Sequence, residues 1–428
     1  MSSFRFGDVA AARARIRDAG RALRARPRGE VLDSLAEVLN RWREPSSKAR
    51  RSLDLSLPEA TGFSREMVRA GLALALERWT GDAFQAVVRR ELDPGARGSE
   101  PGRTLAVGFE ATSVLLAGAL PTPTLLAILA PLAVGSPALV RTSSGDPVTA
   151  RVVASSIAEV DPKLGACVEV VQFPAGDREA LEVFLSAECV VASGSNATLR
   201  AIAPLVPPPQ RLVAYGHRVS ITVLGPEALT STSLPQTCPR VALDIALWDQ
   251  LGCLSPIAVY AVVPDRLAID QLASGLASAL AQIEQELPRG RVPITGAAAF
   301  ARARADAELR GAASRSVAVY GTAQDPWCVV REDSAELREA PMHRFVRVHP
   351  VADLAALPTA LAALSPYLAA VAIDGFGLEA RSVAQLMAER GASRVCPPGR
   401  MQAPPLGWHH DGQGILTPLC RFSDLEPD

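Results

Sequence analysis

Cys253 is the residue whose surroundings in the sequence best suit covalent chemistry. A predicted helix ends at Gly252, a turn follows at Cys253, and an apolar strand begins at Pro256. A thiol on such a turn lies close to backbone N–H groups, which favour the thiolate and can stabilise the oxyanion formed when a thiolate attacks a carbonyl. The spacing indicates a nucleophile, with a buried structural cysteine as the alternative.

The loop after the short apolar strand at residues 138–140 has the composition of a phosphate site. It offers one fixed cation and several hydroxyl groups, from Arg141, Thr142, Ser143 and Ser144. Asp146, followed by Pro147, is expected to cap the next helix. The alternative is a helix-capping loop that binds no ligand.

Gly194, Ser195 and Asn196 form a second candidate phosphate turn. They follow a predicted strand and open a helix, so backbone N–H groups and the positive end of the helix dipole would face an anion bound there. The turn lacks the GxGxxG pattern and is not specific for a dinucleotide when taken alone.

Most of the histidines do not suggest a separate site. His409, His410 and Asp411 are consecutive, but no third ligand follows at a standard spacing, so we predict no metal and expect a structural or pocket-wall role. His343 and His349 flank a predicted strand and are expected at the surface or as supporting groups.

Alternating strands and helices must position these candidate residues. Residues 8–92 have helical spacing with arginine-rich polar faces, which predicts a helical N-terminal region. Residues 105–224 alternate short apolar strands with helices, and residues 233–395 do so again. This pattern predicts two α/β domains, the first with a parallel sheet that is covered on both faces and binds ligands at the carboxyl ends of its strands.

Composition excludes several other classes of protein. With 44 Lys and Arg against 45 Asp and Glu the net charge is −1, so no overall field attracts nucleic acid or an anionic membrane. The uncharged run between Glu110 and Arg141 is cut by four prolines and predicts no transmembrane segment. The N-terminus carries arginine throughout and no apolar signal, and the seven cysteines include no CxxC pair, so we expect a cytoplasmic protein with reduced thiols.

Four segments together resemble a known family. The chain resembles the acyl-CoA reductases of the bacterial luciferase (lux) fatty acid reductase type, which are members of the aldehyde dehydrogenase superfamily. The resemblance covers roughly residues 100–428 and keeps the segments in order, namely AGALPTPTLLAILAPLAVGSPALVRTSSGDP, SGSNATLRAI, YGHRVSITVL and DQLGCLSP.

This resemblance implies an aldehyde-dehydrogenase-like α/β fold, with a Rossmann-type parallel-sheet cofactor domain, a second α/β catalytic domain and a helical N-terminal region. We expect residues 1–232 to contain the helices and the dinucleotide-binding domain, and residues 233–395 to contain the catalytic domain. Residues 396–428 would form a tail that packs on the cofactor domain or on a partner subunit. The resemblance also implies that Cys253 takes the acyl group as a thioester and releases CoA or another thiol.

The resemblance assigns the two phosphate turns to the cofactor. Arg141 stands where the family usually has lysine, and its charge suits the 2′-phosphate of NADPH. The residues expected to bind the cofactor are Arg141, Thr142, Ser143, Gly194, Ser195 and Asn196.

Two differences from related enzymes bear on the reaction. The segment 215–224, where hydrolytic aldehyde dehydrogenases carry a water-activating glutamate, contains no carboxylate and instead has His217 and Arg218. His217 could exchange a proton with Cys253 or with the oxyanion, or have only a structural role. Ala119 replaces an asparagine that usually helps to hold the oxyanion, so another donor substitutes, the backbone N–H of Cys253 suffices, or the activity differs.

The resemblance thus implies an NADPH-dependent reductase that converts an acyl-CoA, or another acyl thioester, to the aldehyde, with a long-chain fatty acyl group as in the family. An acyl-transferring partner protein is conceivable, and the superfamily suggests a homo-oligomer. The alternatives are a cysteine acyltransferase or thioesterase, a non-catalytic scaffold on the same fold, and an oxidative aldehyde dehydrogenase.

Overall fold

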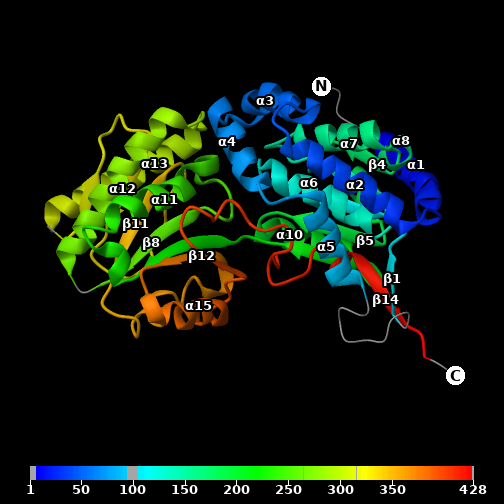
Figure 1. The fold of residues 1–428 in the computed structure, drawn as a ribbon. Coiled ribbons are helices and arrows are strands. Elements are labelled where there is room, and N and C mark those ends of the chain that lie inside the picture. Colours follow the sequence, from blue (N-terminus) through cyan, green and yellow to red (C-terminus); the bar gives the residue numbers. More distant parts are fainter. Residues whose placement is uncertain (1–5, 94–103, 264, 315, 427–428) are drawn as a thin grey trace. The chain divides into compact units, whose positions relative to one another are not determined.

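The computed structural model describes residues 6–93, 104–263, 265–314 and 316–426. Within these residues the chain forms two compact units (Figure 1). The first contains the chain up to Thr61, the segment Ala75–His217 and the chain from Pro405 onwards, and the second contains Gly62–Leu74 and Arg218–Pro404.

The first unit is built on a five-stranded parallel sheet with the strand order β4-β3-β2-β5-β6. Its central strands are short apolar segments that are buried on both faces, as parallel strands between two layers of helices are. The strands are β2 (Thr112–Leu115), β3 (Ala138–Arg141), β4 (Val168–Val171), β5 (Cys189–Ser193) and β6 (Arg211–Tyr215).

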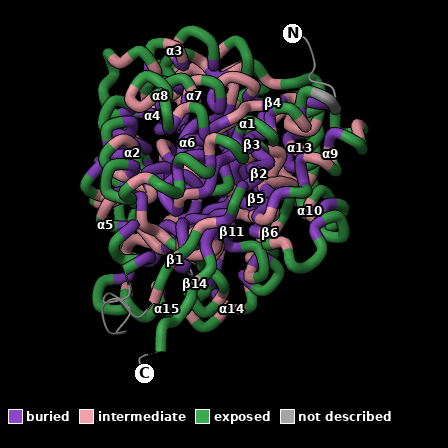
Figure 2. Tube along the Cα trace, turned by 90° about the vertical axis from the view of Figure 1, so that its right-hand side faces the viewer, coloured by how far each residue is buried: buried purple, intermediate pink, exposed green. Residues whose placement is uncertain are grey.

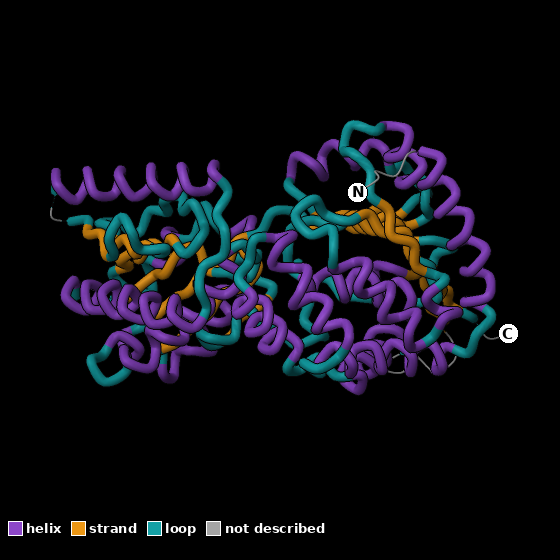
Figure 3. Tube along the Cα trace, turned by 90° about the horizontal axis from the view of Figure 1, so that it is seen from above, coloured by secondary structure: helices purple, strands orange, loops and turns teal. Residues whose placement is uncertain are grey.

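Helices cover both faces of this sheet (Figure 3). On one face α6 (Pro121–Ala133) and α7 (Thr149–Val160) pack against each other and against α2 (Arg28–Arg43). On the other face α1 (Phe6–Arg24) shares its apolar core with α9 (Arg178–Leu185). The other helices of this unit are α3 (Lys48–Thr61), α5 (Gly81–Leu92), α8 (Pro162–Gly165) and α10 (Asn196–Ile202), and α4 (Arg65–Leu76) belongs mostly to the second unit.

The C-terminal segment returns to the first unit. Strand β14 (Cys420–Asp424, red in Figure 1) pairs antiparallel with β1 (Thr104–Gly108, cyan). Upstream of β14 the carboxylate of Glu91 accepts hydrogen bonds from the backbone N–H groups of Ile415, Leu416 and Thr417 at 2.8–3.1 Å. These bonds fix the tail on α5, because the buried carboxylate has its partners there.

The second unit is built on a seven-stranded sheet with the order β13-β12-β7-β8-β11-β10-β9. All neighbouring pairs are parallel except β9 with β10. The strands are β7 (Val219–Leu224), β8 (Pro256–Val262), β9 (Ala318–Tyr320), β10 (Cys328–Arg331), β11 (Phe345–Val351), β12 (Leu368–Asp374) and β13 (Arg394–Cys396).

Clusters of buried apolar residues cover both faces of this second sheet. Residues of α11 (Leu234–Ala246) and α12 (Arg266–Glu286) form one core with alternate residues of β8, β10 and β11. The opposite face is covered by α13 (Ile294–Ala313), α14 (Leu357–Ala360) and α15 (Ala380–Glu389). Figure 2, in which the first unit faces the viewer, shows buried residues inside and exposed residues on the outside.

The division of the chain differs from the predicted one in three places. The segment Gly62–Leu74, predicted within the first domain, belongs to the second unit. The second unit also takes the chain from Arg218, so strand β7, which was expected in the first sheet, lies between β12 and β8 of the second sheet. The tail is divided as well, since β13 belongs to the second unit and the chain from Pro405 belongs to the first. An apolar run such as that of β7 predicts a strand but does not say which sheet it joins.

The uncharged run before Arg141 forms β2, α6 and β3, with α6 beginning at Pro121, a residue that suits the first turn of a helix. In the part of the chain that the structure describes, no helix is long and apolar enough to cross a membrane.

Candidate active site

The segment before Cys253 is not the continuous helix that the sequence predicts. Helix α11 ends at Ala246 instead of Gly252. Trp248, Asp249 and Gln250 then adopt left-handed backbone conformations with φ of 57°, 50° and 63°. This conformation costs roughly 1–2 kcal/mol for each residue other than glycine, so contacts made by their side chains must hold it.

Trp248 is the largest of these anchors and has 1% of its surface exposed. Its ring packs edge-on against Phe63 with the centroids 5.4 Å apart, and its backbone N–H donates to the Met67 sulfur at 3.0 Å. A Cβ on Gly71 would come within 2.3 Å of the indole, so only glycine leaves room for it. These residues from the segment 62–74 of the second unit therefore hold the start of the turn.

Asp249 and Gln250 anchor the turn to further chain segments of the same unit. The carboxylate of Asp249 accepts from the Gly290 N–H at 3.0 Å and from Arg344 Nε at 3.1 Å. The side-chain amide of Gln250 donates to the carbonyls of Pro256 and Phe345 at 2.8 and 3.0 Å. Both side chains are buried, so the hydrogen bonds satisfy groups that have little access to water.

Cys253 itself is exposed, while a buried side chain of the neighbouring strand β7 holds its backbone. The hydroxyl of Ser220 on β7 donates to the carbonyl of Cys253 at 2.7 Å, and Ser220 is fully buried. Two residues further on, the hydroxyl of Ser255 accepts from Gln402 Nε2 at 2.9 Å. A fixed backbone with an accessible thiol suits a nucleophile, because the sulfur can meet a substrate without a change in the turn.

The other cysteines differ from Cys253. All seven lie in the described residues, and each of the other six is buried or partly buried. Burial raises the pKa of the thiols of Cys167, Cys238 and Cys396 to about 11, and those of Cys189 and Cys328 to about 12. A thiol that stays protonated inside a core is inert, so Cys253 is the candidate nucleophile.

The candidate cofactor residues share one edge of the first sheet. The register pairs Leu115 of β2 with Arg141 of β3 on one side and with Ala192 of β5 on the other. Arg141 and the Gly194 turn are therefore separated by one strand, or about 10 Å at the usual strand spacing. This is the carboxyl edge of a parallel sheet, where such folds bind ligands.

Arg141 already has partners within the chain. Its guanidinium donates to the Phe173 carbonyl at 3.0 Å and lies 4.7 Å above the centre of the Phe173 ring. Partial burial lowers the pKa of Arg141. The contacts fix the cation at the end of β3, and its buried Nε has no hydrogen-bond partner among the described residues.

The loop that follows contains further polar atoms in need of a partner. Asp146 caps α7, since its Oδ1 accepts from the N–H groups of Val148 and Thr149 at 3.0 and 2.9 Å. Asp146 Oδ2 and the hydroxyls of Thr142 and Thr149 are buried and have no hydrogen-bond partner within the described chain. Ser143 accepts from Gly145 instead. Buried polar groups of this kind fit a loop that binds a polar ligand.

The second turn is organised by its own side chains. Ser195 caps α10, because its hydroxyl accepts from the Thr198 N–H at 3.1 Å. Asn196 Oδ1 accepts from the His217 N–H at 3.0 Å, so the turn is fastened to the chain that leaves β6. His217 is the last residue of the Ala75–His217 segment of the first unit and is exposed.

Ala119 follows Gly118 in the loop between β2 and α6 and is partly exposed.

The surface position expected for His343 and His349 is wrong. Both side chains are buried, with exposed fractions of 8% and 0%. His349 lies within β11, and burial lowers the pKa of both imidazoles. In the described part of the chain, no three His, Cys, Asp or Glu side chains are placed to hold a metal ion.

The sequence did not identify the supports of the Cys253 turn. Ser220, Gln402 and Arg344 come from β7, from the chain after β13 and from the chain before β11. None stands at a motif spacing from Cys253. A polar residue in an otherwise apolar strand, such as Ser220, was the one available signal.

Comparison with known sequences gives one family. The chain matches the family described as acyl-CoA reductase (LuxC) over residues 24–422. It is 24% identical over 415 residues to the long-chain acyl-protein thioester reductase of Aliivibrio fischeri, covering 93% of this chain and 82% of that protein. It is also 24% identical over 331 residues to the enzyme of that name from Vibrio harveyi, covering 75% and 67%.

Solved structures show the same fold. An oxidoreductase from Marinobacter aquaeolei superposes with a TM-score of 0.77 at 14% identity, covering 98% of this chain and 90% of that one. An NAD-dependent benzaldehyde dehydrogenase from Corynebacterium glutamicum gives 0.72 at 15% identity, covering 99% and 90%. These likenesses confirm the predicted aldehyde-dehydrogenase-like fold.

Proposed function

The chain belongs to the acyl-CoA reductase (LuxC) family, and we propose that it reduces a thioester-linked acyl group to an aldehyde through an acyl-enzyme on Cys253. The observation that carries the proposal is the exposure of Cys253 on a turn with a fixed backbone, when the other six cysteines are buried or partly buried. Membership of the family and the fold support an aldehyde-forming oxidoreductase with a nicotinamide cofactor.

The reaction begins when the Cys253 thiolate attacks the carbonyl carbon of the thioester. The backbone N–H groups of the turn are the candidate donors to the oxyanion, since Ala119 has no side-chain amide to offer. Collapse of the tetrahedral adduct forms the Cys253 thioester and releases the carrier thiol, which takes up one proton.

The second half of the reaction returns Cys253 to its starting state. The turn Gly194-Ser195-Asn196 and Arg141 would hold a nicotinamide cofactor, which when bound would supply the hydride that the acyl carbon needs. The resulting thiohemiacetal breaks its C–S bond, so the aldehyde leaves and the Cys253 thiolate is regenerated. His217 is the candidate proton carrier for these steps, because it is exposed and no carboxylate lies in residues 215–224 to activate water.

We propose NADPH as the reductant. Support comes from Arg141, a cation fixed at the carboxyl end of β3, and from the buried polar atoms of the loop behind it that have no hydrogen-bond partner among the described residues. Thr142, Ser143 and the turn Gly194-Ser195-Asn196 would complete the cofactor site. Arg141→Ala should raise the KM for NADPH at least tenfold and change that for NADH little, and an equal effect on both would place the 2′-phosphate elsewhere.

The substrate we propose is a long-chain acyl group carried by CoA or by a protein thiol. The support is the name of the relatives, which describes reductases of long-chain acyl-protein thioesters. Mass spectrometry of protein mixed with acyl-CoA, without cofactor, should show one acyl group on the peptide that contains Cys253. NADPH should then discharge this group as the aldehyde.

The matched control for this experiment is Cys396→Ala, which removes a partly buried thiol from the same unit. Cys253→Ala should abolish both acylation and NADPH oxidation, and Cys396→Ala should keep both. NADPH oxidation that persists in Cys253→Ala would remove the proposed mechanism. Acyl transfer that needs no nucleotide would instead favour a cysteine acyltransferase or thioesterase on this fold.

A further inference from the structure

Two strained segments lie together in the second unit. Besides Trp248–Gln250, the residues Met342, His343 and Arg344 also have left-handed backbones, with φ of 66°, 58° and 69°. Of the seven residues other than glycine with positive φ in the described chain, six belong to these two triplets. The first triplet leads into the Cys253 turn, and the second leads into β11.

The triplets are bonded directly to each other. The His343 N–H donates to the Asp249 carbonyl at 3.1 Å. Arg344 places Nε 3.1 Å and Nη2 2.9 Å from Asp249 Oδ1. The Gln250 amide reaches the carbonyl of Phe345, the first residue of β11. A left-handed backbone takes its N–H and C=O groups out of the hydrogen bonding of helices and sheets. Each of the two segments therefore supplies hydrogen-bond partners to the other.

The ion pair at the centre of this contact is buried. Arg344 has 0% and Asp249 4% of its surface exposed. Arg344 Nη1 also binds Glu284 of α12 at 2.6 Å, and the second oxygen of Asp249 accepts from the Gly290 N–H. A Cβ on Gly290 would come within 2.9 Å of that oxygen, so the carboxylate is enclosed. Removal of Arg344 would take away the cation that the buried Asp249 carboxylate binds, which proteins tolerate poorly.

We propose that the Asp249–Arg344 ion pair positions the Cys253 nucleophile, and that it sets the rate of acylation without contacting the substrate. This inference rests on the proposed role of Cys253. Asp249 lies four residues before Cys253, so a shift of the first triplet moves the thiol and the backbone N–H groups next to it. Small displacements of reacting groups cost large factors in rate.

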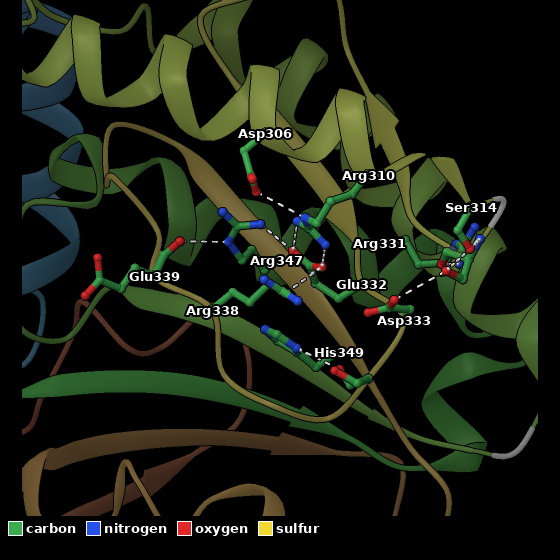
Figure 4. Close-up of polar contacts among 12 residues, drawn as sticks. Asp306, Arg310, Ser314, Arg331, Glu332, Asp333, Arg338, Glu339, Arg347 and His349 are labelled. Carbon is green, nitrogen blue, oxygen red and sulfur yellow. Dashed lines mark hydrogen bonds and ion pairs between the residues drawn. The ribbon is translucent and has the colours of Figure 1, made fainter. Parts of the chain in front are cut away.

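A second buried ion pair provides a matched control. Arg347, three residues after Arg344 on the same chain segment, is 4% exposed and pairs with Glu332, which is 1% exposed (Figure 4). Arg310 binds the same carboxylate at 2.7 and 3.1 Å. In Figure 4 the guanidinium groups of Arg310 and Arg347 both point toward the carboxylate of Glu332. The Arg347 guanidinium lies 5.0 Å from the centre of the Phe345 ring, and the Phe345 carbonyl accepts from Gln250, so Arg347 reaches the turn only through Phe345 among the described contacts. Loss of Arg347 therefore removes a buried cation of the same kind and leaves the Asp249–Arg344 ion pair in place.

The experiment compares Arg344→Met with Arg347→Met in the full chain. Both variants should lower the melting temperature. At a temperature where both stay folded, Arg344→Met should slow single-turnover acylation by acyl-CoA at least tenfold and lower kcat similarly, with KM within twofold. Arg347→Met should keep acylation within twofold of the wild type. Arg344→Lys, which keeps the charge but not the two-pronged contact, should give an intermediate rate.

A second readout separates this inference from the proposed function. Alkylation of Cys253 by iodoacetamide, followed from pH 6 to 10, needs no acyl substrate and reports the thiolate and its access. The alkylation profile should shift in Arg344→Met and stay unchanged in Arg347→Met. If the wild type forms no acyl-enzyme, the proposed function fails while the alkylation comparison still tests the positioning.

The inference is overturned if Arg344→Met matches Arg347→Met in both acylation and alkylation. If Arg344→Met does not fold, Asp249→Asn takes its place, because it keeps the shape of the side chain and removes the charge that Arg344 binds. Asp249→Asn with wild-type acylation and alkylation would overturn the inference in the same way.

Discussion

Ser220→Ala is the substitution whose cost follows most directly from the structure. The Ser220 hydroxyl donates to the Cys253 carbonyl at 2.7 Å and accepts from the Ala370 N–H at 3.1 Å. It lies at an irregular place in the sheet, since the β7–β8 register shifts after Ser220 and its partner there, Pro256, has no N–H to donate. The hydroxyl thus replaces hydrogen bonds that the strands cannot form.

The expected loss of stability is about 3 kcal/mol. A buried N–H left without a partner, here that of Ala370, costs about 1–3 kcal/mol, and loss of the hydrogen bond to Cys253 costs about 0.5–1.5 kcal/mol. For a unit of about 200 residues, a loss of 3 kcal/mol lowers the melting temperature by roughly 6–12 °C. The freed turn should also slow acylation of Cys253 several-fold.

The assay is thermal unfolding with single-turnover acylation measured in parallel. Ser393→Ala is the control, because the Ser393 hydroxyl donates to the Ala369 carbonyl at 3.0 Å and the backbone N–H of the same residue also bonds that carbonyl. This control should cost less than about 1 kcal/mol and leave acylation unchanged. If Ser220→Ala costs no more than Ser393→Ala, the hydroxyl does not supply the missing bonds, and the reasoning is refuted.

Three further changes have expected outcomes. Burial raises the pKa of Asp244 to about 7, so its contribution to stability is complete below about pH 4 and is lost as the pH rises to 7; Asp244→Asn should flatten urea unfolding midpoints over that range. Burial alone would raise the pKa of Glu91, but the hydrogen bonds from residues 415–417 lower it, so the stabilisation that its carboxylate gives is lost as the pH falls. Glu91→Gln should weaken the attachment of the tail to α5 by about 2 kcal/mol at pH 7, which faster proteolysis of the tail would show. Gly71→Ala places a Cβ 2.3 Å from the Trp248 ring and should cost about 1–3 kcal/mol and slow acylation, whereas Gly29→Ala, which meets no atom within 4 Å, should do neither.

Much of the fold could be predicted from the sequence because it depends on local patterns. Short apolar runs bounded by turn residues predicted the parallel strands, and the helical N-terminal region followed from periodicity. The exchange of β7 between sheets could not be foreseen, since its apolar run at residues 219–224 suits the interior of either sheet. Which strands pair depends on contacts that are remote in sequence.

The candidate site divides in the same way. Cys253, Arg141 and the Gly194 turn were identified because each follows or precedes a strand at a place where ligands meet such folds. The early end of α11 was missed because Trp248 and Gln250 have no local preference for a left-handed backbone. Side chains elsewhere in the unit impose it, including Phe63, which packs on Trp248.

The Cys253 turn is held by several side chains at once, so substitutions of these side chains should have coupled effects on the rate of acylation. Three hydrogen bonds hold the turn, namely that of Asp249 with Arg344, that of the Cys253 carbonyl with Ser220 and that of Ser255 with Gln402. Their partners lie on different elements of the second unit. Residues in one hydrogen-bonded network do not act additively, so a second support lost from a turn already loosened should cost less than the first. A double variant of Ser220→Ala and Gln402→Ala should therefore slow acylation by less than the product of the single effects. Independent, multiplicative effects would mean that each support acts on Cys253 alone and that the turn does not move as one body.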